Sequence, residues 1–232
     1  MLEVNNLNKK YNKFFAAKDL NFTVNKGELA ILVGPNGAGK STTLKSIAGL
    51  LKYDGEIKVC GKNNKSIEGK KLLSYVPELP ALFPLLSIDE HIHFIAKAYG
   101  ISNYENYADE LLEKFDLKDK RDKLGQELSK GMQQKVSICC ALITKPKVIL
   151  FDEPMIGLDP KAIKELKNIL IELRDSGVSL LISTHLLDSM DGIWDRILIM
   201  KNGEIILSKN KFEFDNTEES LEDIFFEVTE DK

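Results

Sequence analysis

The chain has 232 residues, a formal charge of −4, 43% hydrophobic residues and 29% charged residues. This length is enough for one or two domains with a large core, and it excludes a peptide hormone or a small disulfide scaffold. The near-average composition excludes a disordered, collagen-like or coiled-coil chain. The negative net charge argues against a surface that binds nucleic acid, so no nucleic-acid partner is expected.

Apolar runs and cysteines indicate the compartment. The longest apolar runs, such as 148–151 and 179–182, are far shorter than the roughly 18 to 20 residues that span a bilayer. Cys60, Cys139 and Cys140 form an odd number without zinc-site spacing, which predicts reduced cysteines. The first residues lack the basic start and long apolar stretch of a secretory signal. We therefore expect a cytoplasmic location.

The first half of the chain predicts strands followed by helices. Short segments rich in β-branched or large apolar residues, bounded by turn formers, predict strands at 2–4, 22–24, 29–33 and 57–60. From residue 89 to about 143, apolar residues recur at three- and four-residue spacing, which predicts an inserted helical region.

The second half predicts a return to strands. Apolar runs without alternation at 148–151 and 179–182 are separated by a helical pattern, which is typical of a parallel sheet covered on both faces. The fold class is therefore α/β. A hairpin is expected at 196–207, and the acidic tail from Asp215 is expected to end in a short amphipathic helix.

Residues 34–41 match the phosphate-binding pattern G-x-x-x-x-G-K-[ST], with an apolar strand before them and helical spacing after them. Glycines let the backbone N–H groups wrap a phosphate, and the helix that starts near Lys40 points its positive end at the same anion. Lys40 is expected to reach the β- and γ-phosphates, and the Ser41 hydroxyl to ligate Mg²⁺. The alternative is a glycine-rich turn that only joins a strand to a helix. The predicted nucleotide-binding residues here are Gly34, Pro35, Asn36, Gly37, Ala38, Gly39, Lys40, Ser41 and Thr42.

Two carboxylates follow the apolar run at 148–151. In open α/β sheets, ligands bind beyond the carboxyl ends of the strands, where Asp152 and Glu153 should lie. In a phosphate-loop enzyme the first carboxylate holds Mg²⁺ and the second polarises an attacking water. Asp152 is therefore predicted as a metal residue and Glu153 as the catalytic base. Alone, such a pair often marks only the start of a loop.

Together these motifs resemble the ATP-binding subunit of an ABC transporter over residues 1 to about 210. The resemblance implies a P-loop NTPase (RecA-like) core at 1–77 and 145–211, with an N-terminal antiparallel β subdomain. It also implies an inserted α-helical signature subdomain at 78–144 and a tail at 212–232, all within one ABC ATPase domain.

Residues 128–133 resemble the LSGGQ signature of that family. Ser129 and Gly131 are retained, whereas Lys130 and Met132 depart from the commonest form. A serine and a glycine at the start of a helix expected at 132–143 can present a hydroxyl and backbone N–H groups to a phosphate. The resemblance implies that this phosphate belongs to ATP held by a partner subunit. An ordinary helix N-cap would explain Ser129 by itself.

Further positions match the family one by one. Tyr11 corresponds to the aromatic residue that stacks on adenine, although a core or interface tyrosine is the alternative. Asp159 resembles the loop that communicates across the dimer, and it also fits a helix N-cap before Pro160. His185 follows the run at 179–182 and resembles the switch histidine that contacts the γ-phosphate, with a catalytic role. The histidines at 91 and 93 receive no role.

One position departs from the family. Glu78 stands where the family usually has a glutamine that ligates Mg²⁺ and helps to place the water. A carboxylate binds Mg²⁺ harder but repels the γ-phosphate, so Glu78 is predicted as a metal residue that changes the metal dependence. The stretch 78–91 resembles the corresponding region of ABC-2 type exporters. Exposed Leu82, Phe83 and Leu85 there would form a groove for a helix of a membrane partner. A packed proline-rich connection is the alternative.

The resemblance implies an ATPase that powers a membrane transporter, expected to be an exporter, with ATP and Mg²⁺ as cofactors. It would work as a head-to-tail homodimer or with a paralogous ATPase subunit, peripheral on the inner face of the cell membrane through a membrane-spanning permease. Two alternatives remain open at this point. One is an ABC ATPase that serves a cytosolic protein machine, and the other is a nucleotide-gated regulator with weak turnover.

Overall fold

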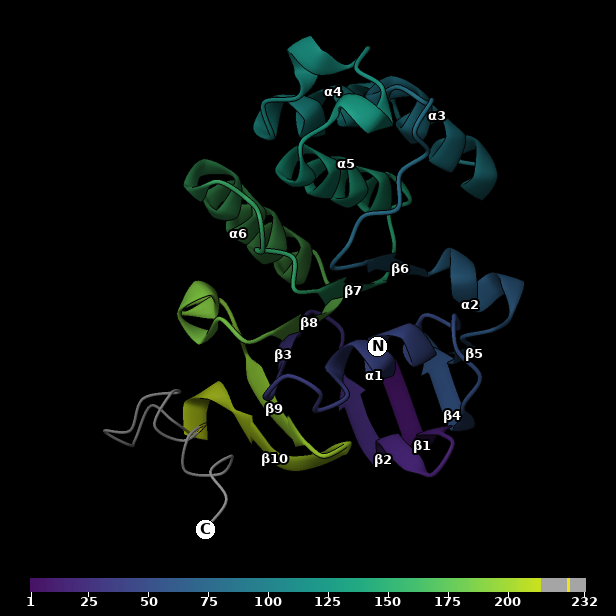
Figure 1. Ribbon diagram of the computed structural model, residues 1–232, viewed down its shortest axis with the longest axis vertical. Helices are drawn as coiled ribbons and strands as arrows, with labels where there is room; N and C mark the ends of the chain where they lie inside the picture. The colour runs from purple at the N-terminus through teal and green to yellow at the C-terminus, as the bar shows by residue number, and fades with distance from the viewer. Residues whose placement is uncertain (214–224, 226–232) are drawn as a thin grey trace.

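The computed structural model describes residues 1–213 and 225, except for the side chains of residues 188 and 189 (Figure 1). The amphipathic helix expected near the end of the acidic tail lies outside these described residues. In the described part of the chain, no helix is long and apolar enough to cross a membrane.

A six-stranded sheet forms the centre of the molecule, in the order β10-β9-β3-β8-β7-β6. Five of its strands run parallel, and the edge strand β10 pairs antiparallel with β9. Every residue of β3, β7 and β8 is buried, because helices and the second sheet cover both faces. The predicted α/β class and the hairpin near the end are thus confirmed. The strands are β3 (Leu29–Val33), β6 (Leu73–Val76), β7 (Val148–Asp152), β8 (Ser179–Thr184), β9 (Arg196–Lys201) and β10 (Glu204–Asn210).

A second, antiparallel sheet has the order β2-β1-β4-β5. Its strands are β1 (Leu2–Tyr11), β2 (Phe14–Val24), β4 (Asp54–Val59) and β5 (Lys62–Asn63). The first two are much longer than the strands predicted at 2–4 and 22–24. Register shifts interrupt their pairing, and Asn6 and Asp19 adopt positive φ angles of 49° and 48°. These bulges, together with exposed polar residues, break the period-two pattern that identifies a strand in sequence.

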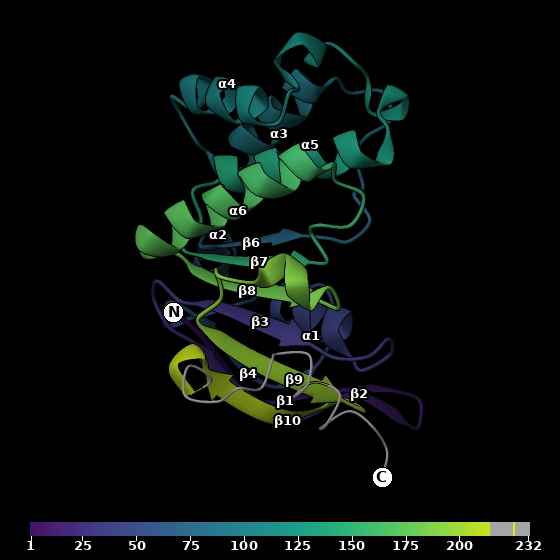
Figure 2. The same ribbon diagram turned by 90° about the vertical axis from the view of Figure 1, so that its left-hand side faces the viewer.

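Helices cover the sheets in layers (Figures 1 and 2). Helix α1 (Lys40–Ile47) contacts strands of both sheets, whereas α6 (Pro160–Asp175) packs on the other side of the central sheet against β8. The predicted helical region lies between β6 and β7 and contains α3 (Ile88–Tyr99), α4 (Glu105–Lys114) and α5 (Lys130–Ile143). Helix α5 starts at Lys130, two residues before the predicted start, because Ser129 caps it. The short elements are α2 (Ile67–Lys71), η1 (Lys118–Lys120), η2 (Gly125–Glu127), η3 (Leu187–Met190) and η4 (Lys211–Glu213).

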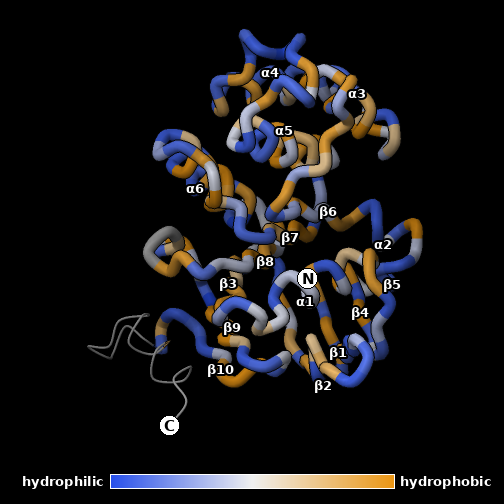
Figure 3. The backbone as a smooth tube through the Cα atoms, viewed as in Figure 1, coloured by the Kyte–Doolittle hydropathy of each residue, from blue (hydrophilic) through white to orange (hydrophobic). Residues whose placement is uncertain are grey.

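Two hydrophobic clusters lie on opposite faces of the central sheet, and strand β3 contributes to both. Leu29, Ile31 and Val33 join the cluster on the helical side, whereas Ala30 and Leu32 join the cluster that faces the antiparallel sheet. Burying one leucine or isoleucine side chain contributes about 1.5–3 kcal/mol. Figure 3 shows the hydrophobic residues gathered along the strands between the layers. This packing holds the carboxyl ends of β3, β7 and β8 side by side.

Candidate functional site

A cavity of about 340 Å³ opens at the carboxyl edge of the central sheet. The turn after β3, Glu153 after β7 and His185 after β8 meet there, because these strands are parallel neighbours. A larger cavity of about 680 Å³ lies among α3, α4 and Arg121, away from these strand ends. The smaller cavity is lined by Tyr11, Phe14, Ala16, Asn36, Gly37, Ala38, Gly39, Lys40, Ser41, Thr42, Glu78, Glu153, Ile156 and His185.

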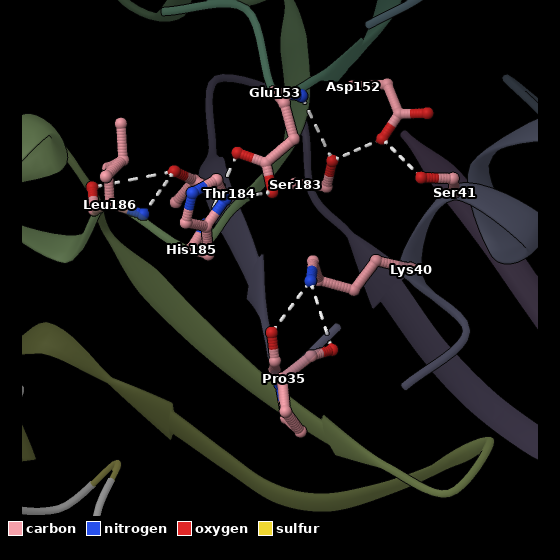
Figure 4. A network of polar contacts seen from close by, with 10 residues as sticks. Pro35, Lys40, Ser41, Asp152, Glu153, Ser183, Thr184, His185 and Leu186 are labelled. Carbon is pink, nitrogen blue, oxygen red and sulfur yellow. Dashed lines mark hydrogen bonds and ion pairs between the residues drawn. The ribbon is translucent and has the colours of Figure 1, made fainter. Parts of the chain in front are cut away.

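The phosphate-binding loop, residues 34–41, is shaped by its glycines. Gly39 precedes α1 with φ 107°, and a Cβ there would lie 2.0 Å from the carbonyl oxygen of Ala16. No side chain caps the start of α1, so its first N–H groups face the cavity edge without a side-chain acceptor. Lys40 Nζ donates to the carbonyl oxygen of Gly34 at 2.7 Å and to that of Pro35 at 3.4 Å (Figure 4). The loop can therefore cradle an anion.

Burial sets the electrostatics of Lys40. Its side chain is buried, and this desolvation lowers the pKa of the ammonium group below its ordinary value. The charges of Glu153, Asp152 and Glu78 act in the opposite direction and favour the charged form. The site therefore combines one buried cation with three carboxylates. A bound phosphate would add further negative charge next to Lys40 and so stabilise its charged form.

Asp152 is buried, with 1% of its surface exposed, and it accepts hydrogen bonds from three hydroxyl groups. Ser41 Oγ and Ser183 Oγ lie 2.9 Å and 2.7 Å from its Oδ1, and the Tyr75 hydroxyl lies 3.1 Å from its Oδ2 (Figure 4 shows the two serines). Burial, and then the charge of Asp152, raise the pKa of the Tyr75 hydroxyl. The hydroxyl therefore stays protonated and can donate.

The donor set around Asp152 fits Mg²⁺ bound together with phosphates. No group of three or more His, Cys, Asp or Glu side chains in the described part of the chain could hold a metal ion by itself. Mg²⁺ prefers oxygen ligands and is usually held by one or two carboxylates together with substrate phosphates and waters. The Ser41 hydroxyl and the Glu78 carboxylate supply such oxygens at the cavity, and the Asp152 carboxylate lies directly behind them, 2.9 Å from Ser41 Oγ.

Glu153 and His185 contact each other directly. His185 Nδ1 lies 2.9 Å from Glu153 Oε1, and the backbone N–H of His185 donates to Oε2 at 3.3 Å (Figure 4). The Glu153 carboxylate is 8% exposed, whereas the imidazole of His185 is 44% exposed. Both residues line the cavity, so the contact joins a buried carboxylate to a partly exposed imidazole, an arrangement that suits a general base and its orienting partner.

The signature residues lie outside this cavity. Ser129 caps α5 by accepting the N–H of Met132 at 3.3 Å. Gly131 lies so close to the loop before α6 that a Cβ would be 2.6 Å from the carbonyl oxygen of Gly157. Asp159 caps α6 through the N–H of Ala162 and forms an ion pair with Lys135 at 2.7 Å. The structure thus shows the N-cap alternative for Ser129 and Asp159, and their ATP contacts across a dimer stay a prediction.

Tyr11 stands at the mouth of the cavity, where 46% of its surface is exposed. Its direct partner across the β1–β2 hairpin is Phe14, which also lines the cavity. Lys9 Nζ lies 4.5 Å from the centre of the Tyr11 ring. Sequence reasoning missed Phe14, although the two-residue turn between two aromatic residues was a readable hairpin signal.

The predicted groove needs one correction. Leu82 is only partly buried but packs against the helical-side core, so it does not belong to an exposed groove. Phe83 and Leu85 are exposed, as are Leu79 in the same connection and Phe94 of α3, whose ring lies 5.4 Å from that of Phe83 between centroids. We call these four residues the apolar patch. The proline-rich connection thus packs through one leucine and exposes its neighbours.

His91 stabilises the loop that carries the apolar patch. Its Nε2 accepts the backbone N–H of Phe83 at 2.9 Å, and its Nδ1 lies 2.6 Å from the carbonyl oxygen of Ser87. Because Nε2 accepts, Nδ1 carries the proton and donates to Ser87. The ring is buried and far from the cavity, so it has a packing role.

Comparisons with known proteins agree with this geometry. The family model described as ABC transporter matches residues 17–156. The ABC-type transporter ATP-binding protein EcsA of Bacillus subtilis (strain 168) is 35% identical over 100% of this chain and 97% of its own length. The lipopolysaccharide export system ATP-binding protein LptB of Haemophilus influenzae is 35% identical over 89% of each chain.

A solved structure extends the comparison. The dimeric ATP-binding cassette in a post-hydrolysis state, bound to ADP and Pi, superposes with a TM-score of 0.81 and 29% identity, over 90% of this chain and 98% of that one. The resemblance noted in the sequence is thus confirmed, together with the P-loop NTPase fold. The chain belongs to the ABC transporter family, as one of its ATP-binding subunits and ABC ATPases.

Proposed function

We propose that this subunit hydrolyses ATP to drive export through a membrane-spanning permease. The observation that carries the proposal is that Lys40, Ser41, Glu153 and His185 line one cavity, with Asp152 bound directly to Ser41 behind it. A loop that binds phosphates, a pair of carboxylates and a histidine are the groups that phosphoryl transfer to water requires. The export direction is supported by the name of LptB, a lipopolysaccharide export protein at 35% identity.

The residue roles follow from the contacts. The loop 34–42 and Lys40 would bind the phosphates, and the Tyr11 ring would stack on the base. Ser41, Asp152 and Glu78 would hold Mg²⁺, which supplies charge neutralisation at the phosphates. Glu153 would accept a proton from the attacking water, because its carboxylate is fixed by His185 at 2.9 Å. His185 would contact the γ-phosphate through its other ring nitrogen, Nε2.

The site is proposed to be completed by a second subunit. Ser129, Gly131 and Asp159 do not line the cavity of their own chain, yet the first turn of α5 can bind an anion. In a head-to-tail dimer, homodimeric or with a paralogous subunit, these residues would meet ATP held by the other chain. The dimeric state of the superposed ATP-binding cassette supports this arrangement.

The apolar patch of Leu79, Phe83, Leu85 and Phe94 is proposed as the permease contact. Exposed apolar side chains gathered on one surface mark interaction sites. An amphipathic helix at the cytoplasmic ends of the permease could lay its apolar face on them. The subunit would then sit on the inner face of the membrane through the permease alone.

Co-purification tests this proposal. The tagged wild-type protein and a Phe83→Glu, Leu85→Glu double variant are expressed in the native host, and membranes are solubilised in detergent. The wild type should retain a polytopic membrane protein that the double variant loses, because two buried charges cost several kcal/mol at an apolar interface. Ile206→Glu, on exposed β10, is the matched control. Capture of soluble proteins alone by the wild type would favour the cytosolic machine instead.

A further inference from the structure

The hydroxyl of Ser183 lies between the two carboxylate residues of the site (Figure 4). Ser183 sits near the end of β8, is fully buried, and is the direct cross-strand partner of Asp152. Its Oγ is 2.7 Å from Asp152 Oδ1 and 3.2 Å from the backbone nitrogen of Glu153. Ser183 does not line the cavity, so it acts only through these two neighbours.

The direction of both hydrogen bonds is fixed by chemistry. An ionised carboxylate can only accept, so Ser183 must donate its single proton to Asp152. The lone pairs of the same oxygen are then left to accept the N–H of Glu153. One side chain therefore sets the direction of Asp152 Oδ1 and the position of the Glu153 backbone at once.

Glu153 needs this support because of its backbone. Its φ of 49° lies in the left-handed region that residues with a Cβ rarely adopt. Such a conformation persists only where the surroundings fix it. The N–H of Glu153 is held by both the carbonyl oxygen and the hydroxyl of Ser183, at 3.1 Å and 3.2 Å. The side chain is held at its other end by His185.

We propose that Ser183 is a positioning residue for ATP hydrolysis. It fixes the position of the Asp152 carboxylate, which would hold Mg²⁺, relative to the catalytic carboxylate of Glu153. This inference rests on the proposed roles of Asp152 and Glu153. Tyr75 completes the arrangement from the other side, because its hydroxyl holds Asp152 Oδ2 at 3.1 Å. Without the Ser183 hydroxyl, Asp152 Oδ1 keeps the Ser41 contact alone among the described residues. The backbone N–H of Glu153 then loses one of its two hydrogen-bond acceptors.

The same strand offers a matched control. Ser179 also lies in β8 and is fully buried, but its Oγ has no hydrogen-bond partner among the described residues. Replacing Ser179 by alanine removes a buried hydroxyl from the same strand without touching either carboxylate. A difference between the two alanine variants therefore reports the contacts of Ser183 and not the loss of a serine from β8.

The test compares wild type, Ser183→Ala, Ser183→Thr and Ser179→Ala in steady-state ATPase assays and in binding of a fluorescent ATP analogue with EDTA. A misplaced catalytic group costs up to about 100-fold in rate, so we expect Ser183→Ala to lower kcat at least about tenfold. KM should change less than about threefold, and analogue affinity in EDTA should stay within about twofold, since the phosphate loop is untouched. Ser183→Thr should recover most of the lost kcat, and Ser179→Ala should match wild type.

Two results would overturn the inference. One is a kcat for Ser183→Ala within about twofold of wild type, and the other is an equal loss in Ser179→Ala. If Ser183→Ala does not fold, as judged by lost analogue binding in EDTA, Ser183→Cys, whose thiol is only a weak donor and acceptor, is judged by the same kcat criterion. Glu153→Gln separates this inference from the catalytic role on which it rests. If Glu153→Gln keeps full turnover, the proposed role of Glu153 as the base fails, whereas a dead Glu153→Gln with an unaffected Ser183→Ala rejects Ser183 alone.

Discussion

Glu153 Oε1 lies 2.9 Å from His185 Nδ1, although the two residues are 32 positions apart in the chain. The contact forms because β7 and β8 are parallel neighbours whose carboxyl ends coincide. Both side chains line the cavity, and the histidine contact fixes the direction of the buried Glu153 carboxylate. The pair thus has the geometry of a base and its orienting group.

Removing this orienting group should slow the chemical step. We expect His185→Ala to lower kcat by about 100-fold or more, in the range of general acid–base contributions, with ATP affinity little changed. Steady-state kinetics and equilibrium binding measure the two effects separately. His93→Ala is the control, since His93 contacts Tyr104 on the helical region. A His185→Ala enzyme with wild-type kcat would show that the contact does not serve catalysis.

Lys40 should be required for nucleotide binding. Its ammonium group is the buried cation of the loop, so Lys40→Ala should weaken ATP binding by about tenfold or more, as expected for losing a charge-assisted hydrogen bond. Isothermal titration measures this change. Lys45→Ala removes an exposed lysine from the same helix and should leave the affinity unchanged. Equal affinities for all three proteins would contradict the phosphate role of Lys40.

Glu78 should control the metal dependence. In Glu78→Gln, the neutral amide binds Mg²⁺ more weakly but no longer repels the γ-phosphate. We expect a higher Mg²⁺ concentration for half-maximal ATPase activity and tighter binding of ATP in EDTA. Glu68→Gln, in the first turn of α2, is the control. If both responses in Glu78→Gln equal those of wild type, the carboxylate has no part in metal or nucleotide binding.

Gly131 should tolerate no side chain. A Cβ at this position would lie 2.6 Å from the carbonyl oxygen of Gly157, so Gly131→Ala must displace the loop between Glu153 and α6. We expect about a tenfold or larger fall in kcat from the shifted loop, with ATP affinity retained. Lys130→Ala changes an exposed residue of the same turn and should be near wild type. Wild-type turnover in Gly131→Ala would show that this close approach is not needed.

The Lys135–Asp159 ion pair should make stability depend on pH. The hydrogen bond from Lys135 lowers the pKa of Asp159 below its ordinary 3.8, so the pair stabilises the fold above that value. The stabilisation is lost as the pH falls through the lowered pKa. Asp159→Asn keeps an N-cap but removes the charge. Because Asp159 is 52% exposed, we expect a difference below about 1 kcal/mol at pH 7.

Urea unfolding of wild type and Asp159→Asn from pH 7 down to about pH 2 measures this dependence. The difference in the free energy of unfolding should shrink to zero toward the acid end. A difference that grows as the pH falls would contradict the assigned sign. Lys161, in α6, forms an exposed ion pair with Asp116, which follows α4. The variant Lys161→Met removes this neighbouring pair and reports how much such a pair contributes to the free energy of unfolding.

Sequence patterns predicted the central sheet and the cavity because both depend on local signals. Fully buried strands such as β3 and β7 read as apolar runs, and the glycines of the loop 34–41 have strict backbone requirements. The order of the parallel strands then places Glu153 near His185. Local patterns thus identified the loop and Glu153, whereas Tyr11, Glu78 and the role of His185 were predicted from the resemblance to the ABC family.

Contacts that depend on register were not predictable in the same way. Tyr75 in a strand looks like an ordinary packing residue, and Ser183 looks like a small residue in an apolar run. Their hydroxyls reach Asp152 only because β6, β7 and β8 pair in one particular register. The partial burial of Leu82 likewise depends on how the loop after β6 turns toward the helices.

The central claim is that ATP is hydrolysed between two subunits with Glu153 as the base. Size-exclusion chromatography of wild type and Glu153→Gln, with and without Mg-ATP, tests it together with the steady-state ATPase rate of each protein. The account predicts that Glu153→Gln loses turnover and becomes a dimer only when ATP is present, because ATP persists at the interface. A Glu153→Gln protein that hydrolyses ATP at the wild-type rate and stays monomeric with ATP would contradict it.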